Sequence, residues 1–115
     1  MDLKAAIQDI NDKILNGKAL EAFETYYADD IVMQENEEAP WEGKDFNRKR
    51  EEAFFANITE FRHAEVLSFA VGDDVTMVEW HMDYTHKEWG DMNYKQVAVQ
   101  RWKDGKIVHE RFYHK

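Results

Sequence analysis

The chain has 115 residues, enough for one domain around a single hydrophobic core. Hydrophobic residues make up 43% of it and aromatic residues 14%, so the composition is that of a globular rather than a disordered protein. The absence of cysteine excludes disulfides, thiol nucleophiles and cysteine-ligated metal centres. The formal net charge of −9 argues against nucleic acid or an anionic membrane surface as a partner, because both require a basic patch.

The N-terminal segment 1–13 is amphipathic and acidic, and it lacks the basic start and apolar centre of a signal peptide. No apolar run in the sequence reaches the roughly 18 residues that are needed to span a bilayer. We therefore expect a cytoplasmic protein with no membrane partner.

The first half of the chain is predicted to be mainly helical. Residues 3–16 carry apolar side chains at helical spacing, and Asn16-Gly17 provides a stop signal. A second helix is predicted over about 18–28, followed by a short strand from Ile31 to Glu35. Residues 36–43 contain the only proline and are predicted to form a loop, and a third helix is predicted over about 44–57.

In the second half the apolar pattern changes to a period of two, which predicts β-strands. The strands are expected over 61–71, 75–87, 93–103 and 106–114, with short turns between them. Helices followed by an antiparallel meander indicate a single α+β domain over residues 1–115, in which three N-terminal helices pack on one face of a curved antiparallel sheet.

Three segments, in this order, resemble the NTF2-like superfamily and within it the SnoaL-like and ketosteroid-isomerase-like branch. They are YADDIVMQE at Tyr27–Glu35, WEGKD at Trp41–Asp45 and RWKDGKIVHERFYHK at Arg101–Lys115. The resemblance implies an NTF2-like (cystatin-like) cone. It does not specify an activity, because this fold carries both enzymes and non-enzymes.

The resemblance also assigns a role to the carboxylate that ends the first strand, since in ketosteroid-isomerase-like enzymes this group is the general base. The matching residue here is Glu35. Those enzymes polarise the substrate carbonyl with a tyrosine on the first helix and a protonated aspartate on the penultimate strand. The matching positions hold Asn11 and Ala98, so the sequence departs from the family pattern at both donors.

Strand alternation predicts which side chains face the helices. A three-residue turn over 104–106 would place Trp102 opposite Val108, Gln100 opposite Glu110, Ala98 opposite Phe112 and Gln96 opposite His114. The predicted concave face then consists of Trp80, Met82, Tyr84, Gln96, Ala98, Gln100, Glu110 and Phe112. The small Ala98 among large aromatic residues is expected to leave a hollow.

The opposite, convex face of the sheet is predicted to be half apolar, with nothing in the chain to cover it. Its apolar members would be Met77, Val97, Val99, Ile107 and Tyr113. We expect a homodimer through this face, as the resemblance to NTF2-like dimers also implies. No histidine pair has the helical spacing of a zinc site, so neither a metal site nor a cofactor is expected.

Glu35 and Glu110 are the two candidate catalytic residues. An alternative for Glu35 is an exposed carboxylate at a strand end, and an alternative for Glu110 is a buried hydrogen bond to Gln100 that fixes the strand register. The candidate ligand-binding residues are mostly aromatic or amide side chains, which suit a flat apolar ligand, although aromatic residues also form cores. They are Tyr27, Trp41, Trp80, Met82, Tyr84, Gln96, Ala98, Gln100, Trp102, Phe112 and His114.

Two functions are compatible with this sequence. The first is a cofactor-independent enzyme of isomerase or cyclase type that transfers a proton on a small organic molecule, with Glu35 as general base. The alternative is a non-catalytic dimeric module that uses the same pocket to bind a small hydrophobic ligand.

Overall fold

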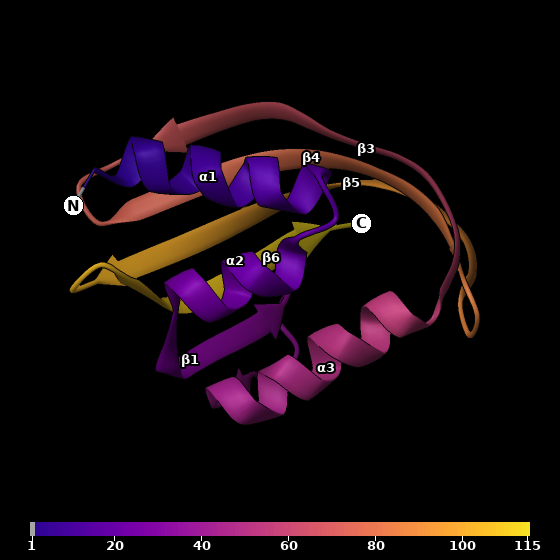
Figure 1. The fold of residues 1–115 in the computed structure, drawn as a ribbon, viewed down its shortest axis with the longest axis horizontal. Coiled ribbons are helices and arrows are strands. Elements are labelled where there is room, and N and C mark those ends of the chain that lie inside the picture. The colour runs from indigo at the N-terminus through magenta and orange to yellow at the C-terminus, as the bar shows by residue number, and fades with distance from the viewer. Residues whose placement is uncertain (1) are drawn as a thin grey trace.

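The computed structural model describes residues 2–115, and over this range it contains three helices and one six-stranded sheet (Figure 1). The elements are α1 (Leu3–Leu15), α2 (Ala19–Tyr26), β1 (Tyr27–Glu35), β2 (Trp41–Glu42), α3 (Lys44–Ala56), β3 (Ile58–Val71), β4 (Val75–His86), β5 (Gly90–Lys103) and β6 (Lys106–His114). This arrangement confirms the predicted α+β class. No helix within residues 2–115 is long and apolar enough to cross a membrane.

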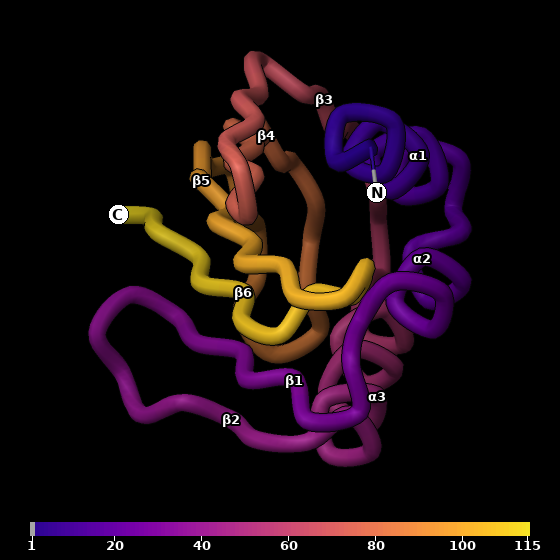
Figure 2. The backbone as a smooth tube through the Cα atoms, turned by 90° about the vertical axis from the view of Figure 1, so that its left-hand side faces the viewer, coloured from indigo at the N-terminus to yellow at the C-terminus, as the bar shows by residue number. Residues whose placement is uncertain are grey.

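The strands lie in the order β2-β1-β6-β5-β4-β3, so β3 is at one edge of the sheet. Strands β3 to β6 form an antiparallel meander, whereas β1 pairs with β6 in parallel. The sheet is strongly curved, and the three helices lie on its concave side (Figure 2). The parallel pairing brings Glu35, at the end of β1, beside Phe112 near the end of the chain.

The core lies between the helices and the concave face of the sheet. On α1, the side chains of Ala6, Ile7 and Ile10 are buried, as the helical spacing predicts. The buried hydrophobic cluster consists of Ala6, Ile7, Ile10, Ala22, Phe23, Tyr27, Ile31, Met33, Val78, Trp80, Trp102 and Ile107. Three of the predicted ligand-binding aromatics, Tyr27, Trp80 and Trp102, are therefore part of the core.

Two boundaries in the first half differ from the prediction. Helix α2 ends at Tyr26, and β1 begins at Tyr27 without an intervening turn. The predicted loop over 36–43 contains the short strand β2, in which Trp41 pairs with Met33 of β1. Single-sequence periodicity does not detect a two-residue strand, because two residues cannot establish a period.

The predicted register of β5 and β6 is confirmed for most of their length. Gln96 lies opposite His114, Ala98 opposite Phe112 and Gln100 opposite Glu110. An irregularity between Arg101 and Trp102 then places Trp102 opposite Ile107 instead of Val108.

This irregularity overturns one predicted side-chain position. Ile107 was expected on the convex face, but its side chain is fully buried in the core cluster. A β-bulge inserts one residue into a strand and so reverses the face on which the following side chain lies.

Candidate functional site

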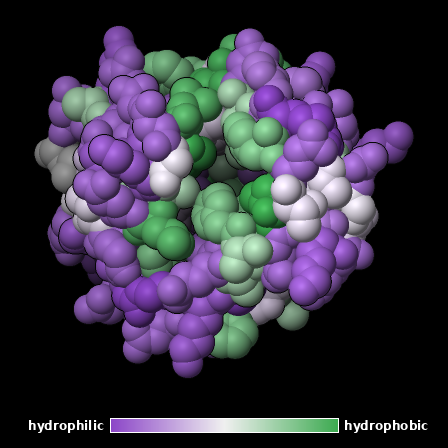
Figure 3. Space-filling model, turned by 45° about the vertical axis from the view of Figure 1, so that its right-hand side comes forward, coloured by the Kyte–Doolittle hydropathy of each residue, from purple (hydrophilic) through white to green (hydrophobic). Residues whose placement is uncertain are grey.

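A central hollow opens on the side of the molecule where α3 ends, and apolar side chains form much of its rim (Figure 3). The elements that meet on this side are the end of α3, the start of β3 and the turn between β4 and β5 (Figure 1). They carry the exposed aromatic side chains Phe55, Phe61 and Trp89. The apolar rim of the hollow is itself suited to contact an apolar molecule.

Glu35 forms a hydrogen-bonded pair with His114. The distance between Nε2 of His114 and Oε2 of Glu35 is 2.5 Å, and the side chains of His114 and Glu35 are 26% and 33% exposed, so both are accessible to a small molecule. Burial disfavours the charged imidazole, but the hydrogen bonds to Glu35 and to the backbone of Lys115, together with the negative charges of Glu35 and Glu38, outweigh it and raise the pKa of His114. The pairing depends on β1 and β6 ending side by side.

Two tyrosines from adjacent strands lie near this pair. The hydroxyls of Tyr84 on β4 and Tyr94 on β5 are 2.7 Å apart, and the Tyr94 ring centroid is 5.9 Å from that of His114. Burial is the main reason why the pKa of each tyrosine is raised, and the negative charge of Glu35 adds to it. Both hydroxyls therefore remain protonated at neutral pH, and the pair can donate one hydrogen bond to a ligand oxygen.

Helix α3 supplies further polar residues to the site, and Asn47 anchors this helix to β2. The buried Asn47 amide donates to the carbonyl oxygens of Trp41 and Gly43, which joins α3 to β2. Its own Oδ1 accepts a hydrogen bond from Arg50, whose guanidinium lies 3.4 Å from the centre of the Trp41 ring. This stacking fixes a cation beside the carboxylates of the site.

Glu51 is the carboxylate on α3 that the structure adds to the site. The side chain is half-buried, and burial raises its pKa to about 7, with the negative charges of Glu110 and Glu35 contributing in the same direction and Arg50 opposing them. Glu51 therefore gains and loses a proton near neutral pH, which is what general acid–base catalysis requires.

Glu110 lies at the centre of a fully buried polar chain. Its two oxygens accept hydrogen bonds from the Tyr27 hydroxyl at 2.5 Å and from the Gln100 amide at 2.8 Å. Gln100 in turn accepts from Thr76, and Thr76 accepts from the Trp102 indole. Burial raises the pKa of Glu110, while both hydrogen bonds oppose the rise. The predicted cross-strand bond between Glu110 and Gln100 is present.

The predicted ligand-binding residues fall into two groups by burial. Tyr27, Trp80, Tyr84, Ala98, Gln100 and Trp102 are buried, whereas Trp41, Met82, Gln96, Phe112 and His114 are half-buried. Of the half-buried residues, Phe112 lies beside Glu35 and Gln96 lies opposite His114.

Sequence reasoning did not identify Arg50, Glu51 or Tyr94 as site residues. A signal for Glu51 was present, since Asn47, Glu51 and Phe54 are spaced by four and three residues and so share one helical face. The two positions that lack family donors are both buried. Ala98 lies opposite Phe112, and Asn11 on α1 has an Oδ1 atom with no hydrogen-bond partner among residues 2–115.

Comparison with protein families explains this arrangement of elements. The model of the SnoaL-like domain matches residues 7–110, which is most of the chain. The chain belongs to the SnoaL-like domain family. No protein of curated function matches it significantly.

Solved structures agree with this assignment. A Mesorhizobium loti protein, whose name gives both SnoaL-like polyketide cyclase and carbohydrate phosphatase, is 28% identical, with a TM-score of 0.88 over 98% of this chain and 99% of that one. A Xanthomonas campestris protein of unknown function with a cystatin-like fold has a TM-score of 0.84 at 13% identity, over 99% and 91% of the two chains. An LEH-like epoxide hydrolase from M. tuberculosis has a TM-score of 0.76 at 12% identity, over 96% and 80%. The SnoaL-like chain thus has the NTF2-like, cystatin-like fold.

Proposed function

We propose that this SnoaL-like protein is a cofactor-independent enzyme that moves a proton between two positions of a small organic molecule, with Glu35 as general base. The observation that carries the proposal is the Glu35–His114 pair, which lies within the electrostatic reach of Glu51 and of the Tyr84–Tyr94 pair. A base, a second titrating carboxyl and neutral hydrogen-bond donors are the groups that isomerase-type chemistry requires.

Each group has a defined part in this reaction. Glu35 removes a proton from the carbon next to a carbonyl group, and the hydrogen bond from His114 orients the carboxylate for this step. The negative charge that develops on the carbonyl oxygen is stabilised by a hydrogen bond from Tyr84 or Tyr94. These hydroxyls take over the task of the donors that are missing at Asn11 and Ala98. Glu51, protonated in part at neutral pH, returns a proton to the second carbon.

The proposed substrate is a small, mainly apolar carbonyl compound. The apolar rim of the hollow favours such a molecule, and the half-buried Met82 and Phe112 would contact its hydrocarbon part. The Arg50 guanidinium, fixed on Trp41, is available to a second oxygen of the substrate. The polyketide-cyclase name of the M. loti structure is consistent with a substrate that carries several carbonyl groups.

The test is the exchange of α-hydrogens for deuterium in heavy water, followed by proton NMR with acetophenone, 2-tetralone and an aryl β-keto ester as probes. The wild-type protein should accelerate exchange for at least one probe, and Glu35→Gln should lower the rate about 100-fold or more. The control is Glu37→Gln, because Glu37 is an exposed carboxylate only two residues after Glu35.

The two variants separate the outcomes. Wild-type exchange rates in Glu35→Gln would contradict the assignment of the base. Saturable binding of a probe without exchange, equal in both variants, would favour the alternative of a non-catalytic module for a small hydrophobic ligand.

A further inference from the structure

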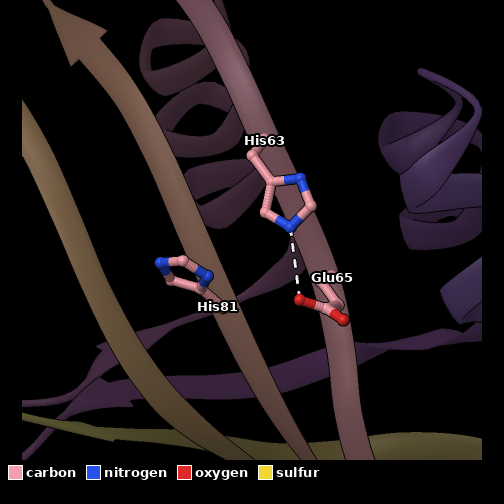
Figure 4. Close-up of side chains that lie close together, drawn as sticks. All are labelled: His63, Glu65 and His81. Carbon is pink, nitrogen blue, oxygen red and sulfur yellow. Dashed lines mark hydrogen bonds and ion pairs between the residues drawn. The ribbon is translucent and has the colours of Figure 1, made fainter.

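A second group of side chains, which could act as metal ligands, lies on the convex face of the sheet, away from the hollow. His63 and Glu65 on β3 and His81 on β4 point toward one another (Figure 4). One nitrogen or oxygen from each residue lies within 4.8 Å of those of the other two. Glu65 pairs directly with His81 across the strands, and His63 precedes Glu65 by two residues on the same face.

A local irregularity of β3 produces this arrangement. The register shifts between Phe61 and His63, which turns His63 to the convex face. Arg62 lies at the shift and donates to Asp83 at 2.8 Å and to Thr85 at 2.6 Å. The backbone that carries His63 is therefore fixed by side-chain contacts to β4, although β3 is an edge strand.

Two of the three side chains already have the separation that a bound ion would impose. Nε2 of His63 is 3.3 Å from Oε1 of Glu65. Ligands about 2.0–2.1 Å from a tetrahedral zinc ion lie about 3.3 Å from each other. Only His81, which is half-buried, has to approach for all three to bind one ion.

A hydrogen bond on the side of the His81 ring that faces away from His63 and Glu65 sets the tautomer needed for metal binding. Nε2 of His81 is 2.7 Å from Oδ1 of Asn93 on β5. Because a carbonyl oxygen only accepts hydrogen bonds, Nε2 carries the proton and Nδ1 of the neutral ring keeps its lone pair. The second ring nitrogen faces His63 and Glu65 (Figure 4). Histidine ligands of metals characteristically donate from the other ring nitrogen in this way.

We propose that His63, Glu65 and His81 form a binding site for one divalent zinc-type ion on the convex face, with Asn93 as its positioning residue. The donor set of two imidazoles and one carboxylate suits zinc and similar transition ions better than magnesium or calcium. Three protein ligands leave a fourth position for water. Lys95, opposite His81 on β5, is the cation that opposes binding. The ion would tie the edge strand β3 to β4.

The experiment is a calorimetric titration of the full chain with zinc chloride. Wild type should bind one ion per chain, and His63→Asn and His81→Asn should each weaken binding at least tenfold. Asn93→Ala should weaken it about tenfold, because loss of a partner that orients a ligand costs 10- to 100-fold in affinity. His109→Asn is the matched control, since His109 lies on β6, outside the cluster.

A second measurement locates the ion directly. In proton NMR spectra, zinc should shift the ring signals of His63 and His81 and leave those of His109 in place, while circular dichroism checks that each variant is folded. The proposal is overturned if zinc does not bind to wild type, or if His63→Asn and His81→Asn bind zinc as tightly as wild type does. It is also overturned if the shifted signals belong to other histidines.

Discussion

Glu110 and Glu51 show that glutamate has a structural role at one position of this fold and a chemical role at another. Both oxygens of Glu110 are occupied by hydrogen bonds from Tyr27 and Gln100, and burial isolates it from water. A carboxyl held in this way joins β5 and β6 to the start of β1. The second carboxyl of the interior, Glu51, is half-buried and free to titrate.

The Tyr27→Phe variant tests the structural role of Glu110. It removes one of two hydrogen bonds to a buried carboxyl, so the free energy of unfolding should fall by about 1–3 kcal/mol. Urea unfolding followed by circular dichroism measures this change. Tyr113→Phe, at an exposed position on β6, is the control and should change stability by less than about 0.5 kcal/mol. Equal stabilities of the two variants would show that the Tyr27 bond contributes nothing.

Glu51 predicts a specific dependence of stability on pH. Its pKa rises from 4.5 to about 7 on folding, so the folded state binds more protons than the unfolded state between these values. The contribution of Glu51 to stability is therefore present below pH 4.5 and is lost as the pH rises through about 7. Glu51→Gln should flatten this part of the curve and stabilise the chain at pH 8 by about 1–3 kcal/mol, a range lowered for partial solvation.

Urea unfolding at a series of pH values between 4 and 9 measures the effect of Glu51→Gln. The neighbouring Glu52→Gln variant is the control, because Glu52 is an exposed carboxylate of the same helix. Parallel curves for wild type and Glu51→Gln would contradict the raised pKa.

At the scale of elements, the β1–α3 connection shows why a sequence motif can be specific for a fold. Gly43, the central residue of the WEGKD segment, has a φ of 94° and a ψ of 144°, a conformation that only glycine adopts readily. Its amide donates to the carbonyl of Ile31, and its carbonyl accepts from the buried Asn47. One residue thus ends β2, starts α3 and orients the helix that carries Glu51.

Gly43→Ala tests this connection. Nothing lies within 4 Å of a Cβ atom placed at Gly43, so the cost arises from backbone strain alone and should be about 1–3 kcal/mol. Thermal unfolding measures it. Ala56→Gly, at the end of the same helix, exchanges the same two residue types in the opposite direction. It is the control and should cost at most about 1 kcal/mol. A Gly43→Ala protein as stable as wild type would show that this backbone conformation is not required.

The sequence predicted the order of the elements other than β2, because the longer elements each show a period. It also predicted most of the β5–β6 register, although the turn has two residues, Asp104 and Gly105, instead of the expected three. One extra residue in β6, between Ile107 and His109, restores the expected pairing. Alternation could not predict the bulge opposite Arg101 and Trp102, because a single extra residue in a strand leaves no distinct pattern in the sequence. It is the reason why Ile107 faces inward. The same limitation hid His63, whose position on the convex face depends on the register shift in β3.

The candidate site was predicted less completely than the fold. Glu35 was identified because it ends a strand within a family motif, and the concave residues Tyr84, Gln96 and Phe112 followed from alternation. The link between Glu35 and His114 depends on the parallel pairing of β1 with β6, and no local pattern indicates a pairing between residues 79 positions apart. The contribution of Glu51 likewise depends on how α3 packs across the sheet.

At the scale of the whole molecule, the curved sheet presents two faces with different tasks. The concave side holds the core cluster, and the Glu35–His114 and Tyr84–Tyr94 pairs lie outside that cluster. The convex face has no helix over it (Figure 2), and it carries Met77, Val97 and Ala70 around a shallow depression. On β4, Met77 and His81 are four residues apart, or about 13 Å.

We propose that two copies of the chain associate through this part of the convex face. Met77 is 41% exposed, and exposed apolar side chains that line one depression indicate a contact surface. Light scattering after size-exclusion chromatography should give twice the chain mass of 13.7 kDa for wild type. Met77→Lys should shift the mass toward that of one chain, because burying a lysine charge in the contact carries a desolvation cost.

Leu15→Lys is the control for this substitution, because Leu15 is similarly exposed but lies at the end of α1, away from the sheet. It should leave the measured mass unchanged. A single-chain mass for the wild-type protein, or equal masses for the wild type and Met77→Lys, would contradict association through this surface. Both variants replace an exposed apolar group by lysine, so a difference between them reports on the position of the charge rather than on its addition.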